Sequence, residues 1–474
     1  MCSLDKIESL KCKLEHHHQA HVLKYWDTLD EAGRQRLMNQ LQMMDFELIG
    51  RLRELLKGNP QSRQAEMTPP PVIRLPRTPE EKAVAEEAGQ TGEETIRSGK
   101  VCAFLVAGGQ GTRLGYHGPK GCFPIGPVSH KSIFQMHAEK ILAAGLRYNT
   151  TIPWYIMTSE TNHEATKSFF EENGHFGLNP SEVMFFRQNM LPALDEYGRL
   201  ILDAEDHVFT SPNGHGGALE ALVESGAISD MKNRGIEVIS YFQVDNVLIQ
   251  IVDPIFIGFH VQADAEMSSK TLSKRDPYEK LGHFGLLNGK LHVVEYSDMS
   301  EEDLLARDGE GRLKYDAGSP AIHIINPDFV LQEMDGGLRL PYHIATKKIP
   351  FLNDAGEREN PENPNGYKFE TFIFDALQDT SNSIILEASR KHEFSPVKNK
   401  SGEDSPETAK QDLSNYFAEW LEAAGTRVPR DRSGNVRGVV EIGPLFADTK
   451  EAFLNRAPAD LVFKGSFYLD SQND

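Results

Sequence analysis

The chain has 474 residues, of which 39% are hydrophobic and 25% charged, and its formal net charge is −20. A chain of this length exceeds one typical hydrophobic core, so we expect two or three domains. The negative charge repels the backbone of nucleic acids, and no apolar stretch is as long as a membrane span. We therefore expect neither nucleic acid nor a membrane as a partner, and a monomer or weak homo-oligomer.

The cysteines and the first residues bear on the compartment. The four cysteines show neither a C-x-x-C pair nor the spacing of a zinc site. The first residues lack the apolar core of a signal peptide and the arginine-rich composition of a transit peptide. Both observations predict a cytoplasmic protein. The histidines at 16–18, with His21 nearby, are interpreted as a solvated helix face rather than a metal site.

Composition divides the chain into three predicted domains. Residues 1–98 form an N-terminal helical region and linker: apolar residues recur every three or four positions between 22 and 56, and the prolines at 69–71 indicate an extended connection. Residues 99–399 form the catalytic core. Residues 400–474 form a small C-terminal domain, which is loop-like over 400–416, helical around 413–424 and continues as a strand and turn.

Strands and helices alternate in the central domain. This alternation predicts an α/β fold with a mainly parallel, doubly wound sheet, whose ligands bind at the carboxyl ends of the strands. We expect strands at 101–106, 152–158, 183–186, 236–244, 291–296 and 384–388, and helices at 131–145 and 164–172.

The segment LVAGGQGTRLGYHGPKG at 105–121 is the most informative part of the chain. A buried strand leads into a glycine-rich turn, where backbone N–H groups can approach a polyphosphate closely. Arg113 can bind phosphate oxygens in bidentate fashion, and Lys120 can act as a point charge. The glycine spacing matches neither a P-loop nor a dinucleotide-binding turn. The pattern favours a phosphate-binding loop over an ordinary tight turn with solvated charges.

Two further segments carry candidate site residues. Asp245 directly follows the predicted strand at 236–244, where a carboxylate can hold Mg²⁺ beside a triphosphate; a strand-end cap is the alternative. PNGHGGALEAL at 212–222 is a second glycine-rich turn opening a helix, with Gly214 and His215 able to approach a polar ligand. The residue pattern alone does not select Lys368 or Lys398, because exposed lysines are normally solvated.

Taken together, motifs between residues 22 and 447 resemble the eukaryotic-type UDP-sugar pyrophosphorylases of the UDPGP type 1 family, closest to the UDP-N-acetylglucosamine pyrophosphorylase branch. The resemblance implies a Rossmann-like nucleotidyltransferase core between a helical N-terminal region and a small C-terminal domain. The motifs that carry it are LVAGGQGTRLG, PKG at 119–121, MTSE at 157–160, FFRQNMLPAL at 185–194, NGHGG at 213–217, QVDN at 243–246, DPIFIGF at 253–259, VVEYSDMS at 293–300, KKIP at 347–350, PNGYK at 364–368 and EFSPVKN at 393–399.

The resemblance implies a reaction of UTP with a sugar 1-phosphate, with Mg²⁺ as cofactor, to give a UDP-sugar and pyrophosphate. UDP-N-acetylglucosamine is the expected product. UDP-glucose, UDP-galactose or broad sugar specificity is the alternative within this class, and a non-catalytic UDP-sugar binding protein is the alternative outside it. The presence of basic residues and Asp245 together favours catalysis over mere binding.

By motif position, the resemblance also assigns roles to individual residues. It implies a catalytic role for Arg113, Lys120 and Lys398, and a metal-binding role for Asp245. It implies nucleotide binding by Val106, Ala107, Gly108, Gly109, Lys120, Gln188, Gly214, Asp245 and Lys368, and binding of the sugar phosphate by His215, Glu295, Tyr296, Ser319 and Lys398.

Two positions depart from the pattern of the N-acetylglucosamine branch. His215 stands where that branch usually has Asn, and Ser319 ends a DAGS segment that is usually NAGN. The loss of side-chain hydrogen bonds to a substrate can change selectivity by orders of magnitude. Both departures therefore bear on which sugar is used rather than on uridylyl transfer itself.

Overall fold

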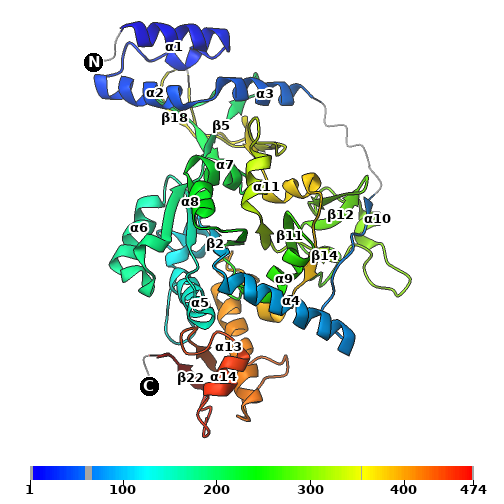
Figure 1. Ribbon diagram of the computed structural model, residues 1–474. Helices are drawn as coiled ribbons and strands as arrows, with labels where there is room; N and C mark the ends of the chain where they lie inside the picture. Colours follow the sequence, from blue (N-terminus) through cyan, green and yellow to red (C-terminus); the bar gives the residue numbers. More distant parts are fainter. Residues whose placement is uncertain (1–3, 59–66, 354, 472–474) are drawn as a thin grey trace. The chain divides into compact units, whose positions relative to one another are not determined.

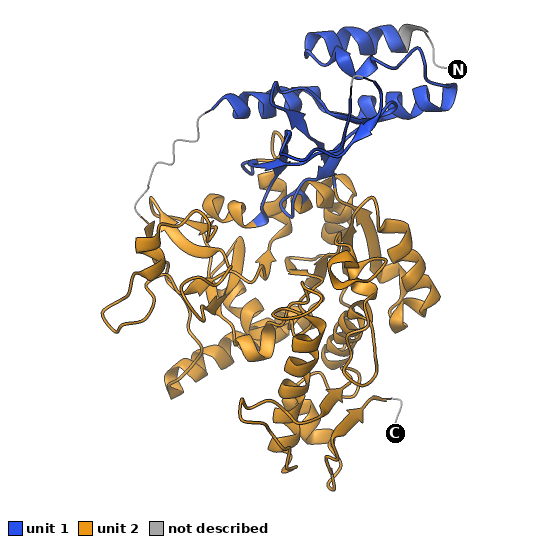
Figure 2. Cartoon of the chain, turned by 180° about the vertical axis from the view of Figure 1, so that it is seen from behind, with its two compact units in different colours: residues 1–64, 189–217, 340–373 blue, residues 65–188, 218–339, 374–474 orange. Residues whose placement is uncertain are grey.

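The computed structural model describes residues 4–58, 67–353 and 355–471, and it divides into two compact units. Unit 1 consists of residues 1–64, 189–217 and 340–373, and unit 2 of residues 65–188, 218–339 and 374–474 (Figure 2). Both units are therefore assembled from segments far apart in sequence. The boundaries between these units differ from the predicted boundaries at 98/99 and 399/400. The predicted boundaries follow changes in local composition, whereas the units are defined by contacts between residues.

A mixed sheet of eleven strands forms the centre of unit 2 (Figure 1). Its parallel part has the order β10-β2-β3-β4. The helices α5 (Ile133–Tyr148) and α6 (His163–Glu172) connect β2 to β3 and β3 to β4. The side chains of β3 are all buried, as expected for a parallel strand covered on both faces. These four strands are β2 (Val101–Val106), β3 (Trp154–Thr158), β4 (Val183–Arg187) and β10 (Val238–Gln243).

The other part of this sheet is mostly antiparallel. β15 (His323–Ile325) pairs antiparallel with β10 and with β11 (Met267–Ser273), so the direction of the strands reverses there. The α/β class is confirmed, and among the described strands of this sheet parallel pairing is confined to β10-β2-β3-β4 and to β20 beside β11. The remaining strands are β1 (Met67–Thr68), β12 (His283–Leu287), β13 (Lys290–Val294), β14 (Ala317–Gly318) and β20 (Ile385–Glu387).

The C-terminal segment begins with a helix that is longer than expected. α13 (Pro406–Ala423) starts seven residues before the predicted 413, so the expectation of a loop up to 416 is wrong. Ser405 caps this helix by accepting a hydrogen bond from the Thr408 N–H at 3.3 Å, and Pro406 occupies the first turn. Both are helix-start signals that outweigh the polar composition. α14 (Lys450–Arg456) and the parallel pair β21 (Val439–Ile442) and β22 (Ser466–Leu469) follow.

Buried charges tie this C-terminal segment into unit 2. The Glu441 side chain, 2% exposed, accepts hydrogen bonds from the N–H groups of Val128 at 2.7 Å and Ser129 at 2.8 Å. The Lys131 ammonium donates to Glu139 at 2.7 Å and Asp470 at 2.6 Å. Buried charges are tolerated when they are paired and hydrogen-bonded. The residues after 400 therefore share the structure of the sheet unit.

Glycines allow two helices of unit 2 to touch through their backbones. α4 (Pro79–Arg97) presents a stripe of small buried residues to α9 (Pro254–Gln262). A Cβ on Gly92 would lie 1.8 Å from the carbonyl oxygen of Pro254, and one on Gly258 would lie 1.6 Å from that of Ala88. α4 falls within the predicted N-terminal region, yet it packs in unit 2. Other helices are α7 (Gly217–Glu224), α8 (Ala227–Asn233), α10 (Glu301–Leu305), α11 (Pro327–Glu333) and α12 (Arg390–Glu393).

Unit 1 combines three helices with small sheets. The amphipathic pair expected between 22 and 56 is present as α2 (Glu31–Met43) and α3 (Phe46–Lys57), preceded by α1 (Leu4–His16). A three-stranded sheet has the order β16-β19-β6, and three strand pairs accompany it. These strands are β16 (His343–Lys347), β19 (Gly366–Glu370), β6 (Leu194–Asp195), β5 (Met190–Pro192) with β9 (Thr210–Pro212), β7 (Leu202–Ala204) with β8 (His207–Val208), and β17 (Phe351–Leu352) with β18 (Arg358–Glu359).

The described residues also bear on metals, thiols and membranes. His16 and His18 are exposed, but His17 and His21 are half-buried and the His21 ring is hydrogen-bonded to the Leu200 carbonyl at 2.8 Å, so the predicted solvated face is present only in part. The described residues contain no cluster of three or more potential metal ligands. Cys12, Cys102 and Cys122 are free thiols, and Cys2 lies outside the described residues. No described helix has both the length and the apolar character that crossing a membrane requires.

The contact between α4 and α9 predicts that Gly258→Ala destabilises the protein. The new methyl group has no room beside Ala88, and overpacking of this kind costs about 3 kcal/mol. Gly50→Ala is the matched control, because nothing lies within 4 Å of its Cβ position in α3, and it should be neutral or stabilising by up to about 1 kcal/mol. Thermal unfolding measures both midpoints. An unchanged midpoint for Gly258→Ala would contradict the close approach.

A buried carboxyl group in α11 predicts a pH dependence of stability. The Glu333 side chain is fully buried, and neither oxygen has a hydrogen-bond partner among the described residues. Burial raises the pKa of Glu333 from 4.5 to about 7, so the folded state binds a proton that the unfolded state loses. Stability from this group is present below pH 4.5 and is lost as pH rises to about 7, by roughly 3 kcal/mol.

Glu333→Gln removes this titration and should flatten the decline in unfolding midpoint between pH 5 and 8. Thermal unfolding of both proteins across this pH range measures the difference in slope. Equal slopes would show that Glu333 does not titrate in this range.

Candidate active site

The glycine-rich loop after β2 folds back on itself. The Gly111 N–H donates to the Gly118 carbonyl at 2.9 Å, and the Lys120 N–H donates to the Gly109 carbonyl at 3.1 Å. Two short 3₁₀ helices, η2 (Gly111–Leu114) and η3 (Lys120–Cys122), lie within the loop, and Gly115 between them has a left-handed φ of 74°. These bonds fix the backbone of the segment that was predicted to bind phosphate.

Gln188 lies against the first glycines of this loop. A Cβ on Gly108 would come within 3.0 Å of the Gln188 amide nitrogen, so the Gln188 side chain lies tightly against the backbone of the loop. Gln188 follows β4, and its N–H donates to the Thr158 carbonyl at the end of β3, at 2.8 Å. The structure thus brings Gln188 against the loop at 106–109, five of the residues that the resemblance assigns to the nucleotide.

Asp245 lies beside the basic part of the same loop. β10 runs parallel to β2, and the Val244 N–H donates to the Val106 carbonyl at 3.2 Å. The Lys120 ammonium lies 4.0 Å from an Asp245 carboxylate oxygen, and the side chains are only 17% and 11% exposed. Arg113 is exposed and forms no ion pair with a described residue. One cation, Lys120, and one carboxylate, Asp245, therefore meet where two strands end, and Arg113 lies in the same loop.

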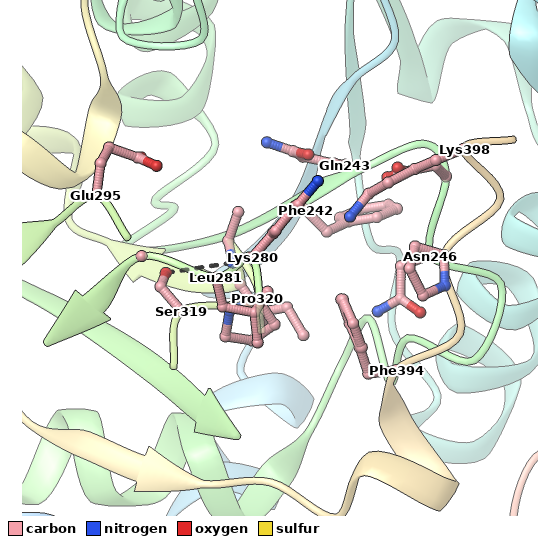
Figure 3. A pocket seen from close by; sticks show the side chains of 15 residues that line it. Phe242, Gln243, Asn246, Lys280, Leu281, Glu295, Ser319, Pro320, Phe394 and Lys398 are labelled. Carbon is pink, nitrogen blue, oxygen red and sulfur yellow. Dashed lines mark hydrogen bonds between the residues drawn. The ribbon is translucent and has the colours of Figure 1, made fainter. Parts of the chain in front are cut away.

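A cavity of about 180 Å³ opens next to Asp245. Among the predicted site residues, Asp245, Glu295, Ser319 and Lys398 line it, whereas Tyr296 is 37% exposed and does not. Figure 3 shows Glu295 and Ser319 on one side of the cavity and Lys398 and Asn246 on the other. The cavity thus combines carboxylate, hydroxyl and ammonium groups. Its other lining residues are Phe242, Gln243, Lys280, Leu281, Gly282, Pro320, Ala321, Ile322, Phe394 and Pro396.

The segment at 393–398, which carries Lys398, is held against Asp245 by backbone and amide contacts. The Asn246 side chain donates to the Glu393 carbonyl at 2.7 Å and accepts from the Ser395 N–H at 3.0 Å. The Val397 N–H donates to the Asp245 carbonyl at 3.0 Å. The Lys398 side chain is 41% exposed and lies 3.6 Å from an Asp404 carboxylate oxygen, an arrangement that leaves the ammonium accessible.

A buried charge triad supports the start of this segment. The Lys270 ammonium, 1% exposed, donates to Asp253 at 2.6 Å and to Glu393. Burial opposes the charge on Lys270, but the two carboxylates outweigh it and raise its pKa to about 12. Removing one member of such a triad leaves an uncompensated buried charge. The triad therefore fixes the chain at Glu393, the residue directly before Phe394.

Three polar lining residues, Gln243, Asn246 and Lys280, were not among the site residues predicted from the sequence. Lys280 is exposed and forms no ion pair with a described residue, so its charge is free to face the cavity. Gln243 and Asn246 flank the position of Asp245. In the sequence, the QVDN motif at 243–246 indicates Gln243 and Asn246, and the position of Lys280 two residues before Gly282 is the signal for this lysine. A single lysine near a glycine is too common to stand out without the fold.

Gly214, His215 and Lys368 belong to unit 1. Gly214 has a left-handed φ of 67°, which explains the glycine in this turn. The His215 Nδ1 accepts a hydrogen bond from the Ile373 N–H at 3.2 Å, and its ring stacks on Phe372 at 5.2 Å. Burial, together with His343, lowers the pKa of His215 to about 4, so the ring is neutral at pH 7. Lys368 lies in β19, and burial lowers its pKa.

Comparisons with known proteins agree with this geometry. The family model described as UTP–glucose-1-phosphate uridylyltransferase matches residues 61–404. UDP-N-acetylglucosamine pyrophosphorylase of Saccharomyces cerevisiae is 36% identical over 86% of this chain and 90% of the yeast protein. The human UDP-N-acetylhexosamine pyrophosphorylase-like protein 1 is 36% identical over 89% of this chain and 86% of that protein.

Among solved structures, the uridine diphosphate N-acetylglucosamine pyrophosphorylase of Trypanosoma brucei, determined in complex with an inhibitor, has a TM-score of 0.83 at 26% identity and covers both chains completely. The match of the family model extends from the linker through the whole sheet to the segment that bears Lys398. The resemblance inferred from the motifs is confirmed. The chain belongs to the UTP–glucose-1-phosphate uridylyltransferase family of nucleotidyltransferases.

Proposed function

We propose that this protein transfers the uridylyl group of UTP to N-acetylglucosamine 1-phosphate, releasing pyrophosphate and UDP-N-acetylglucosamine. The observation that carries the proposal is the meeting of Lys120, Asp245 and Lys398 around one glycine-rich loop and one cavity. The names of the yeast and trypanosome relatives support the choice of sugar. A protein that only binds a UDP-sugar has no need of this set of charges, so the non-catalytic alternative is disfavoured.

The residues present fit a magnesium ion that arrives with the triphosphate. Mg²⁺ is commonly held by one or two carboxylates, with phosphate and water oxygens completing its coordination. Asp245 provides one such carboxylate at the cavity, while the Asn246 amide is already bound to the segment at 393–398. When bound, the cation neutralises charge on the phosphate oxygens. We therefore assign Asp245 as the residue that holds Mg²⁺.

The proposed chemistry needs positioning and charge neutralisation rather than a protein nucleophile. An oxygen of the sugar phosphate forms a bond to the α-phosphorus of UTP, the bond from that phosphorus to the β-phosphate oxygen breaks, and pyrophosphate leaves. We assign Arg113 and Lys120 to the β- and γ-phosphates and Lys398 to the sugar phosphate. Their positive charges reduce the repulsion between the two phosphate-bearing substrates and stabilise the negative charge that develops on the leaving pyrophosphate.

The choice of sugar rests on the residues facing the cavity. Glu295 is proposed to accept hydrogen bonds from sugar hydroxyls, and Ser319 to donate hydrogen bonds to them. Lys280 is proposed to assist Lys398 in binding the phosphate of the sugar 1-phosphate. The departures at Ser319 and His215 keep glucose or galactose 1-phosphate as the second candidate. The roles of Tyr296, Gly214 and Lys368, the cytoplasmic location and the monomeric or weakly oligomeric state stay predictions.

Lys398→Ala should reduce kcat about 100-fold to 1,000-fold while leaving UTP binding nearly unchanged, because the charge acts on the reacting sugar phosphate. Steady-state kinetics and calorimetric titration with UTP separate the two effects. Lys391→Ala is the matched control, since Lys391 is exposed seven residues earlier and does not line the cavity. Equal losses in turnover and UTP affinity would contradict the role assigned to Lys398.

The sugar itself is tested by pyrophosphate release from UTP with four sugar 1-phosphates: N-acetylglucosamine, N-acetylgalactosamine, glucose and galactose. We expect the highest kcat/KM with N-acetylglucosamine 1-phosphate, and loss of release when a chelator removes Mg²⁺. A preference for a plain hexose would support the second candidate and make Ser319 and His215 the determinants of specificity. No release with any sugar, from a protein that still binds UDP-sugars, would overturn catalysis.

A further inference from the structure

A second cavity in unit 2 is not used by the proposed reaction. It encloses about 190 Å³ and is lined by residues of α5, of the loop at 247–252, of α12 and of the C-terminal segment from α13 onwards. We propose that this cavity, termed the α13 cavity, binds a small planar aromatic carboxylate. Three properties carry the proposal: aromatic walls, a half-buried lysine without an ion pair to a described residue, and a volume suited to one or two fused rings.

The aromatic walls come from one face of α13. The rings of Tyr416, Phe417 and Trp420 lie within 5.2–5.3 Å of one another, at interplanar angles between 54° and 89°. Neither the Tyr416 hydroxyl nor the Trp420 indole N–H donates a hydrogen bond to a described residue, although Trp420 is only 3% exposed. Tyr416 is half-buried, and neither polar atom is completely sealed from solvent, so both can meet a ligand in the cavity. The walls thus offer ring faces and two polar edges that a ligand can satisfy.

The cation is Lys140 of α5. Its ammonium donates to the carbonyl oxygens of Val247 at 2.7 Å and Ile249 at 3.0 Å, and it forms no ion pair with a described residue. An ammonium carries three N–H donors, so one remains. Burial lowers the pKa of Lys140 to about 7, as expected for a charge without a counter-ion. A carboxylate in the cavity supplies both the missing acceptor and the missing charge.

The remaining charges of the lining also favour an anion. Arg147 pairs with Asp448, which neutralises both, and Lys450 adds a second cation at the exposed rim. The lining is therefore positive within a chain whose formal net charge is −20. As to size, a cavity of about 150 Å³ holds benzene, so 190 Å³ accommodates one ring or two fused rings with a short acidic arm.

The α13 cavity shares two chain segments with the candidate active site. The loop at 247–252 directly follows Asp245 and Asn246, and His392 lines the α13 cavity two residues before Phe394 lines the other. A ligand that fixes these segments changes how Asp245 and Lys398 are presented. We therefore infer that occupancy alters the kinetics, a consequence that rests on the proposed uridylyl transfer, whereas binding itself does not.

Calorimetric titration of the full-length protein with two matched pairs of probes tests the site: indole-3-acetate against indole-3-acetamide, and phenylacetate against phenylacetamide. We expect at least one acid to bind about tenfold more tightly than its amide. In Lys140→Met this preference should disappear, while Lys82→Met, at an exposed position on α4, should retain it. The comparison of acid with amide in the unchanged protein stands even where Lys140→Met fails to fold.

Absence of binding by both acids at millimolar concentration, or equal binding of acids and amides, would overturn the site. A preference for the acid over the amide that persists in folded Lys140→Met would show that Lys140 does not bind the carboxylate. Kinetics with the better acid should show KM for a substrate changed about threefold or more in the unchanged protein but not in Lys140→Met. Binding without any kinetic change would overturn the coupling alone, and an inactive protein that still binds the acid would count against the proposed function instead.

Discussion

The parallel pairing of β2 with β10 is the constraint on which the candidate active site depends. In this register Val106 lies opposite Gln243, so both strands end at the same edge of the sheet. The glycine-rich loop leaves one strand there and Asp245 follows the other, which brings Lys120 to 4.0 Å from its carboxylate. A shift by one residue would exchange the faces of every side chain on the strand. The buried residues on both faces of these strands therefore fix the positions of the polar ones.

Lys398 lines the cavity next to Asp245, but it lies on an irregular segment, so strand pairing does not position it. Asn246 binds the backbone on both sides of residue 394, and the Lys270 ammonium holds Glu393 from below the surface. Buried ion pairs contribute little net stability, because desolvation offsets their attraction, but breaking one is costly. In this fold the triad of Lys270, Glu393 and Asp253 holds the start of the segment at 393–398 in place, and this segment positions Lys398.

The sequence was informative wherever function and local structure coincide. The loop at 105–121 and the position of Asp245 follow from a buried strand and the residues directly after it, which are local signals. Unit 1 could not be predicted, because its three segments are joined by packing between residues far apart in sequence. The reversed strand β15 and the cavity-lining Lys280 depend on the same long-range contacts. The start of α13 has a local signal, the cap at Ser405 followed by Pro406, although the polar composition of the segment is typical of a loop.

Two groups of cations in unit 2 differ in what neutralises them. The side chains of Lys131 and Lys270 are almost completely buried, and each lies close to two carboxylates. Their charges are therefore neutralised by ion pairs within the fold. Arg113 and Lys280 are exposed and unpaired among the described residues, a state that costs little in water. Because acidic residues outnumber basic ones by 20 across the chain, an anion is repelled from most of the surface and attracted where unpaired cations gather. The distribution of ion pairs, rather than the net charge, thus determines where an anionic substrate binds.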